Sequence, residues 1–208
     1  HTRVAPRGRP VKAAACGQSG PGGSALAKRS HEAHIPAISP PLCDCRMRRG
    51  IDGPLFLGVD THALSAPAQA SALAVLAANG ADVMLARNDE YTPTPAVSHA
   101  ILTYNRGRTT GLADGIVVTP SHNPPESGGF KYNPPNGGPA DEQVTRWIEM
   151  RANAYLSRGL KGVKRVALDK ARAAATTHRY DFLHHYVRDL ARVIDMTVLR
   201  GAKIRVGV

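Results

Sequence analysis

A serine in a stretch rich in proline and glycine is the residue of this 208-residue chain best suited to chemistry. Ser121 lies in the sequence Thr-Pro-Ser-His-Asn-Pro-Pro, directly after a short apolar run that is typical of a buried strand. The flanking prolines restrict the backbone, and the pair Gly128-Gly129 allows close approach before Lys131. A stiff serine with His122 beside it and a lysine nearby suits phosphate chemistry.

Other interpretations of Ser121 remain open at this point. A surface loop rich in proline and glycine could contain a serine that has no function. A serine hydrolase is disfavoured because no Gly-x-Ser-x-Gly motif surrounds Ser121. A sulfatase-like site is also weakened, since neither cysteine nor arginine flanks the Pro120-Ser121 pair.

The surrounding pattern predicts alternating strands and helices. Apolar runs at residues 55–59, 82–86 and 115–119 indicate buried strands, and residues 65–79 and 94–105 favour helices between them. Strand–helix–strand units place their strands parallel, with a right-handed crossover. In open sheets of this kind, ligands bind outside the carboxyl ends of the strands. The Ser121 loop follows the carboxyl end of the strand at residues 115–119.

The remainder of the chain predicts a short extended segment at residues 130–132 and a long helix that begins near Asp141. Further helices are expected at about residues 181–193 and after Asp195, with a strand at residues 203–208. We therefore predict a three-layer α/β/α sandwich with a mixed, mostly parallel sheet over residues 51–165. Residues 166–208 would form linker helices and the first strand of a second, similar domain.

The first fifty residues show no helical or strand period. They hold six prolines and several glycines, so we expect a poorly ordered or altered leader over residues 1–50. A helix after His31 would be hard to form because Pro36, Pro40 and Pro41 would lie inside it, and each interior proline costs about 3 kcal/mol.

Composition excludes several classes of protein. No apolar run reaches the length of a membrane span, and no secretory signal is visible, so a cytoplasmic location is expected. Three clustered cysteines exclude a disulfide framework and a four-cysteine zinc site. The net charge of +11 comes from the two flanks, while residues 51–150 are acidic overall. Nucleic acid is therefore not an expected partner, although binding of a polyanion by the basic flanks stays open.

The serine loop, Thr119 to Pro124, resembles the phosphoserine loop of the α-D-phosphohexomutases. The longer segment from Asp114 to Asp141 is similar to the glucose-specific bacterial phosphoglucomutases. Residues 60–65, 91–98 and 160–165 resemble the same family, so the likeness extends over about residues 50–208 in one register.

The resemblance implies a mechanism in which Ser121 carries a phosphoryl group. Phosphoserine would donate this group to glucose 1-phosphate, and glucose 1,6-bisphosphate would form as the intermediate and return its other phosphate, leaving glucose 6-phosphate. The phosphate on Ser121 would bind Mg²⁺. By the same resemblance, Lys131 takes the proton from the attacking sugar hydroxyl, and His122 neighbours the phosphoserine.

Three further residues are candidates for binding the phosphosugar substrate. Asp60 and His62 follow the first strand at the same edge as Ser121, and the resemblance places them at the rim of the site, although a structural role in their loop is the alternative. Asn123 is the third, and its side chain could instead hold the loop by hydrogen bonds.

The chain departs from the family in two places. Pro21 and Gly22 stand where the family loop has histidine and arginine, which suggests a disrupted reading frame over residues 1–50. The family's Asp-x-Asp-x-Asp magnesium loop has no counterpart here. We therefore expect a truncated phosphoglucomutase with little activity alone; a non-catalytic remnant that binds phosphosugars or a partner is the alternative. The sequence leaves the preferred hexose and the oligomeric state open.

Overall fold

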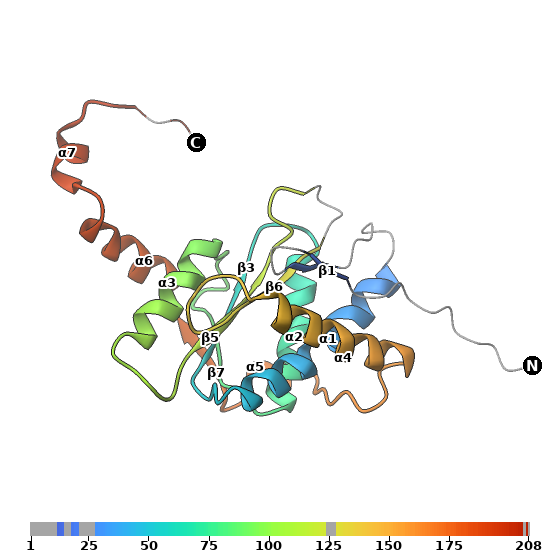
Figure 1. The fold of residues 1–208 in the computed structure, drawn as a ribbon. Coiled ribbons are helices and arrows are strands. Elements are labelled where there is room, and N and C mark those ends of the chain that lie inside the picture. Colours follow the sequence, from blue (N-terminus) through green and yellow to red (C-terminus); the bar gives the residue numbers. More distant parts are fainter. Residues whose placement is uncertain (1–11, 15–17, 21–27, 124–127, 206, 208) are drawn as a thin grey trace, which may run out of the picture.

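A mixed seven-stranded sheet forms the middle layer of the computed structural model, which describes residues 12–14, 18–20, 28–123, 128–205 and 207. The strand order is β1-β2-β6-β5-β3-β4-β7 (Figure 1). The strands are β1 (Lys12–Ala14), β2 (Gln18–Gly20), β3 (Leu55–Val59), β4 (Val83–Ala86), β5 (Asp114–Val118), β6 (Phe130–Asn133) and β7 (Thr177–Tyr180).

Parallel and antiparallel pairs occupy different halves of the sheet. β5, β3, β4 and β7 pair in parallel, whereas β6, β2 and β1 pair antiparallel at the other side. The α/β class and the mixed sheet are confirmed. Within the predicted range of residues 51–165, β3 pairs in parallel with both β4 and β5, and β5 pairs antiparallel with β6, so the mostly parallel sheet is confirmed there. The strands β2 and β1, which precede this range, extend the sheet beyond β6 with further antiparallel pairs.

Helices cover both faces of the sheet, which confirms the three layers. One face packs against α1 (Lys28–Arg48), α2 (Ser65–Ala78), α4 (Glu142–Ser157) and α5 (Leu168–Arg172). The other packs against α3 (Thr94–Asn105) and α6 (Phe182–Asp189). Side chains alternate between the faces along β3, so that Leu55 and Leu57 enter the first core and Phe56 enters the second. Burial on both faces explains the continuous apolar runs of the central strands.

The helix α1 corrects the prediction for the first fifty residues. Residues 28–48 are helical despite three internal prolines, so an irregular leader is wrong for this segment. Ile38 and Leu42 are fully buried against the sheet, and each such side chain contributes roughly 1.5–3 kcal/mol by its burial. The Ser39 hydroxyl also donates a hydrogen bond to the Ile35 carbonyl at 2.8 Å. Tertiary packing thus overrides the low helix propensity of the prolines.

The C-terminal part differs from the prediction in two elements. The strand β7 was not expected, because Thr-His-Arg-Tyr has no apolar run and the strand lies at an edge of the sheet. The strand expected at residues 203–208 is wrong for residues 203–205 and 207, which pair with no described strand. The expected helices are present as α6, the short helix η1 (Leu190–Arg192) and α7 (Met196–Gly201), where Asp195 accepts the N-terminal hydrogen bonds.

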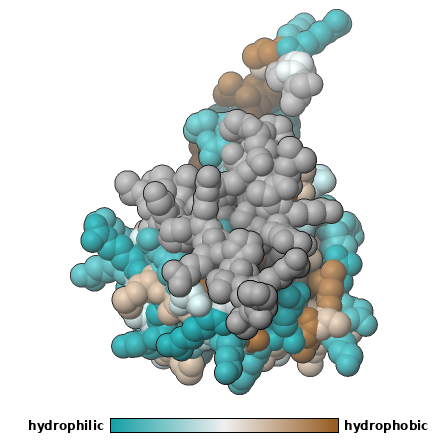
Figure 2. All heavy atoms as spheres, turned by 90° about the vertical axis from the view of Figure 1, so that its right-hand side faces the viewer, coloured by the Kyte–Doolittle hydropathy of each residue, from teal (hydrophilic) through white to brown (hydrophobic). Residues whose placement is uncertain are grey.

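The segment that contains α7 projects away from the three layers (Figure 1). Several of its apolar side chains are exposed, namely Val193, Val198, Leu199 and Ile204. Figure 2 shows hydrophobic residues, coloured brown, in the part of the protein that projects at the top of the view. None of the helices in the described residues is both long enough and apolar enough to cross a lipid bilayer.

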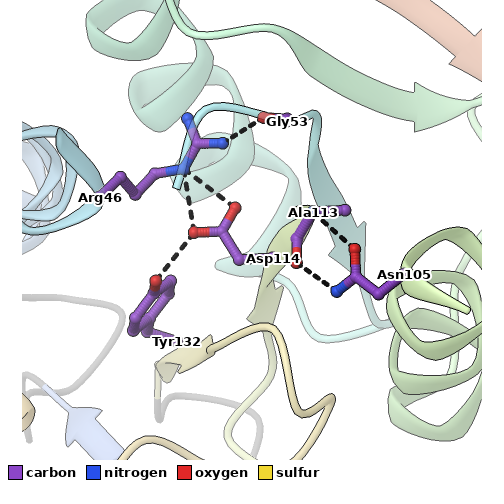
Figure 3. A network of polar contacts seen from close by, with 6 residues as sticks. All are labelled: Arg46, Gly53, Asn105, Ala113, Asp114 and Tyr132. Atoms are coloured by element: carbon purple, nitrogen blue, oxygen red, sulfur yellow. Dashed lines mark hydrogen bonds and ion pairs between the residues drawn. The ribbon is translucent and has the colours of Figure 1, made fainter. Parts of the chain in front are cut away.

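A buried ion pair joins α1 to the sheet (Figure 3). Arg46 Nε lies 2.9 Å from both carboxylate oxygens of Asp114, and its Nη2 donates to the Gly53 carbonyl at 2.5 Å. The Tyr132 hydroxyl donates to Asp114 Oδ2 at 2.8 Å. Burial and the Asp114 carboxylate raise the pKa of Tyr132, so its hydroxyl stays a donor at neutral pH. Three separate elements, α1, β5 and β6, are therefore fixed to one another at a single carboxylate.

Arg46→Met is expected to lower the free energy of unfolding by about 3–5 kcal/mol, because Asp114 would remain buried without its guanidinium partner. The double variant Arg46→Met/Asp114→Leu should recover much of this loss, since no charge is then left in the core. Urea unfolding followed by circular dichroism measures both. Arg146→Met is the control, because the Arg146–Glu142 pair is exposed and should change stability by less than about 0.5 kcal/mol. Equal effects of Arg46→Met and Arg146→Met would contradict the prediction.

Candidate active site

The parallel pairing of β3 with β5 brings two loops together at the carboxyl edge of the sheet. Val59 lies opposite Val118, so Asp60 and Thr119 leave the sheet side by side. The Asp60 N–H donates to the Val118 carbonyl at 3.1 Å and continues the ladder into the loops. The edge that the sequence predicted for ligand binding thus receives polar groups from both strands.

Ser121 lies exposed on a tight turn in the second of these loops. Its backbone has a φ of +65°, a left-handed conformation that costs a non-glycine residue roughly 1–2 kcal/mol. The Ser121 N–H donates to Thr119 Oγ1 at 2.9 Å, and the Asn123 N–H donates to the Pro120 carbonyl at 3.3 Å. The turn therefore presents the hydroxyl to solvent, where an incoming substrate can reach it.

His122 is exposed beside Ser121. Its Nδ1 lies 3.5 Å from Ser121 Oγ, which is the long limit of a hydrogen bond. The two side chains are therefore neighbours, as the sequence predicted, and a phosphoryl group on the serine would lie within reach of the imidazole.

Asp60 is the centre of a hydrogen-bonded group, the Asp60 network, formed by Asp60, His62, Ser65 and Thr119. Ser65 Oγ donates to Asp60 Oδ1 at 2.5 Å, and the backbone N–H of His62 donates to the same oxygen at 3.0 Å. His62 Nδ1 lies 2.8 Å from Asp60 Oδ2, and the Thr119 hydroxyl also donates to this carboxylate.

The ionisation of Asp60 follows from these contacts. Burial raises the pKa of Asp60, but the hydrogen bonds from Ser65, Thr119 and His62 together lower it by more, so the net pKa lies below the ordinary value of 3.8. Asp60 is therefore a carboxylate at neutral pH and acts as an acceptor for all its neighbours.

The strand β6 places Lys131 next to the serine loop. Lys131 is half-buried and lies opposite Val117, near the end of β5. The Thr119 N–H donates to the Gly129 carbonyl at 3.0 Å, so the two segments remain paired up to the loop. A Cβ atom at position 129 would collide with the Thr119 carbonyl oxygen, which explains the need for glycine there.

The structure brings Ser121, His122, Asn123, Asp60 and His62 into one cluster of loops, with Lys131 on the adjoining strand. Among the described residues, Asn123 takes part through its backbone carbonyl, which lies 3.1 Å from His62 Nε2, whereas the sequence suggested a contact of its side chain. Prolines 124 and 125 of the predicted loop lie outside the described residues.

Sequence reasoning missed two members of the Asp60 network. Ser65 is the first residue of α2, where Leu64 holds the cap position, and the Ser65 hydroxyl donates to Asp60. Thr119 was included in the strand and in the serine loop, but no role was predicted for its side chain. Its position directly after an apolar strand and two residues before the serine is the signal that could have identified it.

The described residues do not provide a magnesium site by themselves. They include no group of three or more histidine, cysteine, aspartate or glutamate side chains that could hold a metal ion. The carboxylate of Asp60 already accepts hydrogen bonds from Ser65, Thr119 and His62. These side chains therefore do not fit a complete Mg²⁺ site, which needs about six oxygen ligands.

Gly129→Ala is expected to separate β6 from the serine loop and to lower the free energy of unfolding by about 1–3 kcal/mol, because the added methyl group has no space. Thermal unfolding measures the change. Gly138→Ala is the matched control, since the nearest atom to its Cβ would be Asn136 Oδ1 at 3.8 Å. If both alanines were tolerated equally, the close approach at Gly129 would be refuted.

Asp60→Asn should reduce stability by an amount that depends on pH. A carboxylate with a lowered pKa contributes stability that is present above its ordinary pKa and is lost as the pH falls through the lower folded-state value. The difference between wild type and Asp60→Asn should thus be constant from pH 7 to 5 and shrink below about 3.8. Urea unfolding at several pH values tests this, and a difference that already disappears at pH 6 would contradict it.

Comparison with known proteins gives a consistent result. Residues 15–158 match the family described as phosphoglucomutase/phosphomannomutase, alpha/beta/alpha domain I. A phosphoglucomutase of Komagataeibacter xylinus is 55% identical over 194 residues, which are 93% of this chain and 35% of that protein. A phosphoglucosamine mutase of Synechococcus sp. (strain WH7803) is 29% identical over 153 residues, 74% of this chain and 29% of that protein. The chain thus spans about a third of the length of these curated relatives.

Solved structures show the same fold. A candidate phosphomannomutase of Thermus thermophilus superposes with a TM-score of 0.70 at 22% identity, covering 92% of this chain and 38% of that one. The open form of parafusin, a phosphoglucomutase from Paramecium, gives 0.63 at 21% identity, covering 93% and 37%. With the fold, the serine loop and the family match in agreement, the chain belongs to the phosphoglucomutase/phosphomannomutase family and contains its α/β/α domain I.

Proposed function

We propose that this chain provides the phosphoserine of a phosphoglucomutase, which interconverts glucose 1-phosphate and glucose 6-phosphate. The main support is the exposed hydroxyl of Ser121, held on a tight turn at the carboxyl edge of the sheet. The identity of 55% to a phosphoglucomutase of Komagataeibacter xylinus favours a glucose phosphate as the substrate. Because the chain spans 35% of that relative, the activity of a whole enzyme is part of the proposal.

In the proposed reaction, phosphoserine 121 transfers its phosphoryl group to the free hydroxyl of the sugar phosphate. The bond from Ser121 Oγ to phosphorus breaks, a new bond to the sugar oxygen forms, and the hydroxyl proton passes to a base. Glucose 1,6-bisphosphate results, and its other phosphate then returns to Ser121. Phosphoryl transfer asks the protein mainly for positioning and for neutralisation of charge.

Two further residues have proposed roles in this transfer. Lys131 lies on the strand that pairs with the segment before Ser121, and we assign to it the removal of the hydroxyl proton. His122, with Nδ1 at 3.5 Å from Ser121 Oγ, would donate a hydrogen bond to the phosphoryl oxygens and offset their charge.

Mg²⁺ is the cation that the family resemblance implies, and it would neutralise charge on the phosphate. Among the described residues, we assign a ligand of this cation to Ser121 alone, and the ligand atoms would be the oxygens of its phosphoryl group. The remaining ligands must come from elsewhere, so no step is assigned to the metal in this chain.

The second candidate function is binding of a phosphosugar or a partner without catalysis. It is favoured by the same comparison, because about two thirds of the Komagataeibacter relative has no counterpart in this chain. We expect the 208 residues alone to show little or no mutase turnover with Mg²⁺ and glucose 1,6-bisphosphate. Robust turnover in a coupled assay would contradict that expectation.

Incubation with glucose 1,6-bisphosphate and Mg²⁺ is expected to add one phosphate to Ser121, detected by mass spectrometry of the intact chain and its peptides. Ser121→Ala should abolish the incorporation because the acceptor hydroxyl is gone. Ser157→Ala is the control, since Ser157 is an exposed serine at the end of α4 whose hydroxyl binds the Ala154 carbonyl. Absence of phosphate on the wild-type chain, or incorporation that persists in Ser121→Ala, would favour the non-catalytic alternative.

A further inference from the structure

We propose that the Asp60 network positions Ser121 by holding its loop at two points, and that His62 is a positioning residue rather than a ligand of the substrate. The claim that this positioning assists phosphoryl transfer rests on the function proposed above. The contacts themselves are independent of that function, because they are present in the protein without phosphate or sugar.

The first point of attachment is the backbone of Ser121 itself. The Thr119 hydroxyl donates to the Asp60 carboxylate, and Thr119 Oγ1 accepts the Ser121 N–H at 2.9 Å. Since a hydroxyl has one hydrogen to donate, its donation to Asp60 leaves the oxygen free to accept from Ser121. Asp60 therefore sets the orientation of the Thr119 hydroxyl that holds the serine in its left-handed conformation.

The second point of attachment lies two residues further along. His62 bridges the carboxylate and the loop, with Nδ1 at 2.8 Å from Asp60 Oδ2 and Nε2 at 3.1 Å from the Asn123 carbonyl oxygen. Both neighbours are acceptors, so both contacts are made at once only by a ring with a hydrogen on each nitrogen.

These contacts leave His62 without a free ring nitrogen. Its side chain is 20% exposed, and so is that of Asp60, which also accepts from Ser65. A sugar hydroxyl could bind either residue only by displacing a contact that holds the loop. One attachment is at the backbone N–H of Ser121, and the other is at the carbonyl of Asn123, two residues later in the chain. Together they restrict the position of Ser121 Oγ.

Two substitutions of His62 separate the contacts. In His62→Asn, the shorter amide can still donate to Asp60 but cannot reach the Asn123 carbonyl. In His62→Gln, the longer amide can reach the carbonyl and loses the contact with Asp60. The readout is amide hydrogen exchange of Ser121 and Asn123, measured by NMR on the full 208-residue chain.

We expect exchange of both amides to be about 3- to 10-fold faster in His62→Asn than in wild type, the range that the loss of one hydrogen bond corresponds to. His62→Gln should be intermediate, because it restores the loop contact. The control is His99→Asn, since His99 is similarly buried and pairs with Asp189 at 2.9 Å away from the serine loop. This variant should leave both loop amides unchanged.

Exchange in His62→Asn at the wild-type rate would overturn the proposal, as would equal acceleration in His62→Asn, His62→Gln and His99→Asn. Phosphate incorporation at Ser121, measured on the same samples, separates this test from that of the proposed function. Slower incorporation in His62→Asn than in His62→Gln supports positioning for transfer. If the His62 variants alter amide exchange while the wild-type chain takes up no phosphate, the two attachments are supported and the proposed function is refuted.

Discussion

The parallel hydrogen bonding of β3 to β5 is the constraint on which the candidate site depends. These two strands are separated in the chain by two helices and β4, yet they are neighbours in the sheet over their full length. Their register places Asp60 beside Thr119, and the contact between these two residues joins the loops that follow the two strands. A shift of one residue would turn every side chain of the shifted strand to the opposite face and separate the two loops.

The buried pair of Arg46 and Asp114 secures the other end of the same strand. Asp114 begins β5, whereas the serine loop follows its end, so the ion pair and the candidate site lie at opposite edges of the sheet. Tyr132 connects the pair to β6, the strand that carries Lys131. The network thus helps to fix the strands that carry the candidate site, although none of its members reaches the site.

At the serine loop, an unfavourable backbone conformation and a set of hydrogen bonds belong together. A left-handed serine is destabilising in isolation, and the surrounding contacts offset this cost. The result is a serine hydroxyl whose position is set by the protein alone. This suits phosphoryl transfer, in which alignment of the donor and acceptor atoms makes up much of the catalysis.

The sequence by itself determined the local elements and the chemical type of the site. The bounds of the strand Leu55–Val59 and the start of the helix Thr94–Asn105 were predicted correctly, because continuous apolar runs and proline near a helix start are local signals. Ser121, His122 and Lys131 were identified from their types and spacing and from the family resemblance, and their roles stay predictions.

The tertiary structure decided what depends on distant neighbours. The helix α1 forms against its proline content because Ile38 and Leu42 are buried by the sheet, and β7 exists because the edge of β4 supplies its hydrogen bonds. Likewise, Thr119 acquires its role only when the pairing of β3 with β5 brings it to Asp60. Propensity is a property of the local chain, whereas burial and hydrogen bonding between strands arise from residues far apart in the sequence, and the sequence pattern does not show which of them will meet.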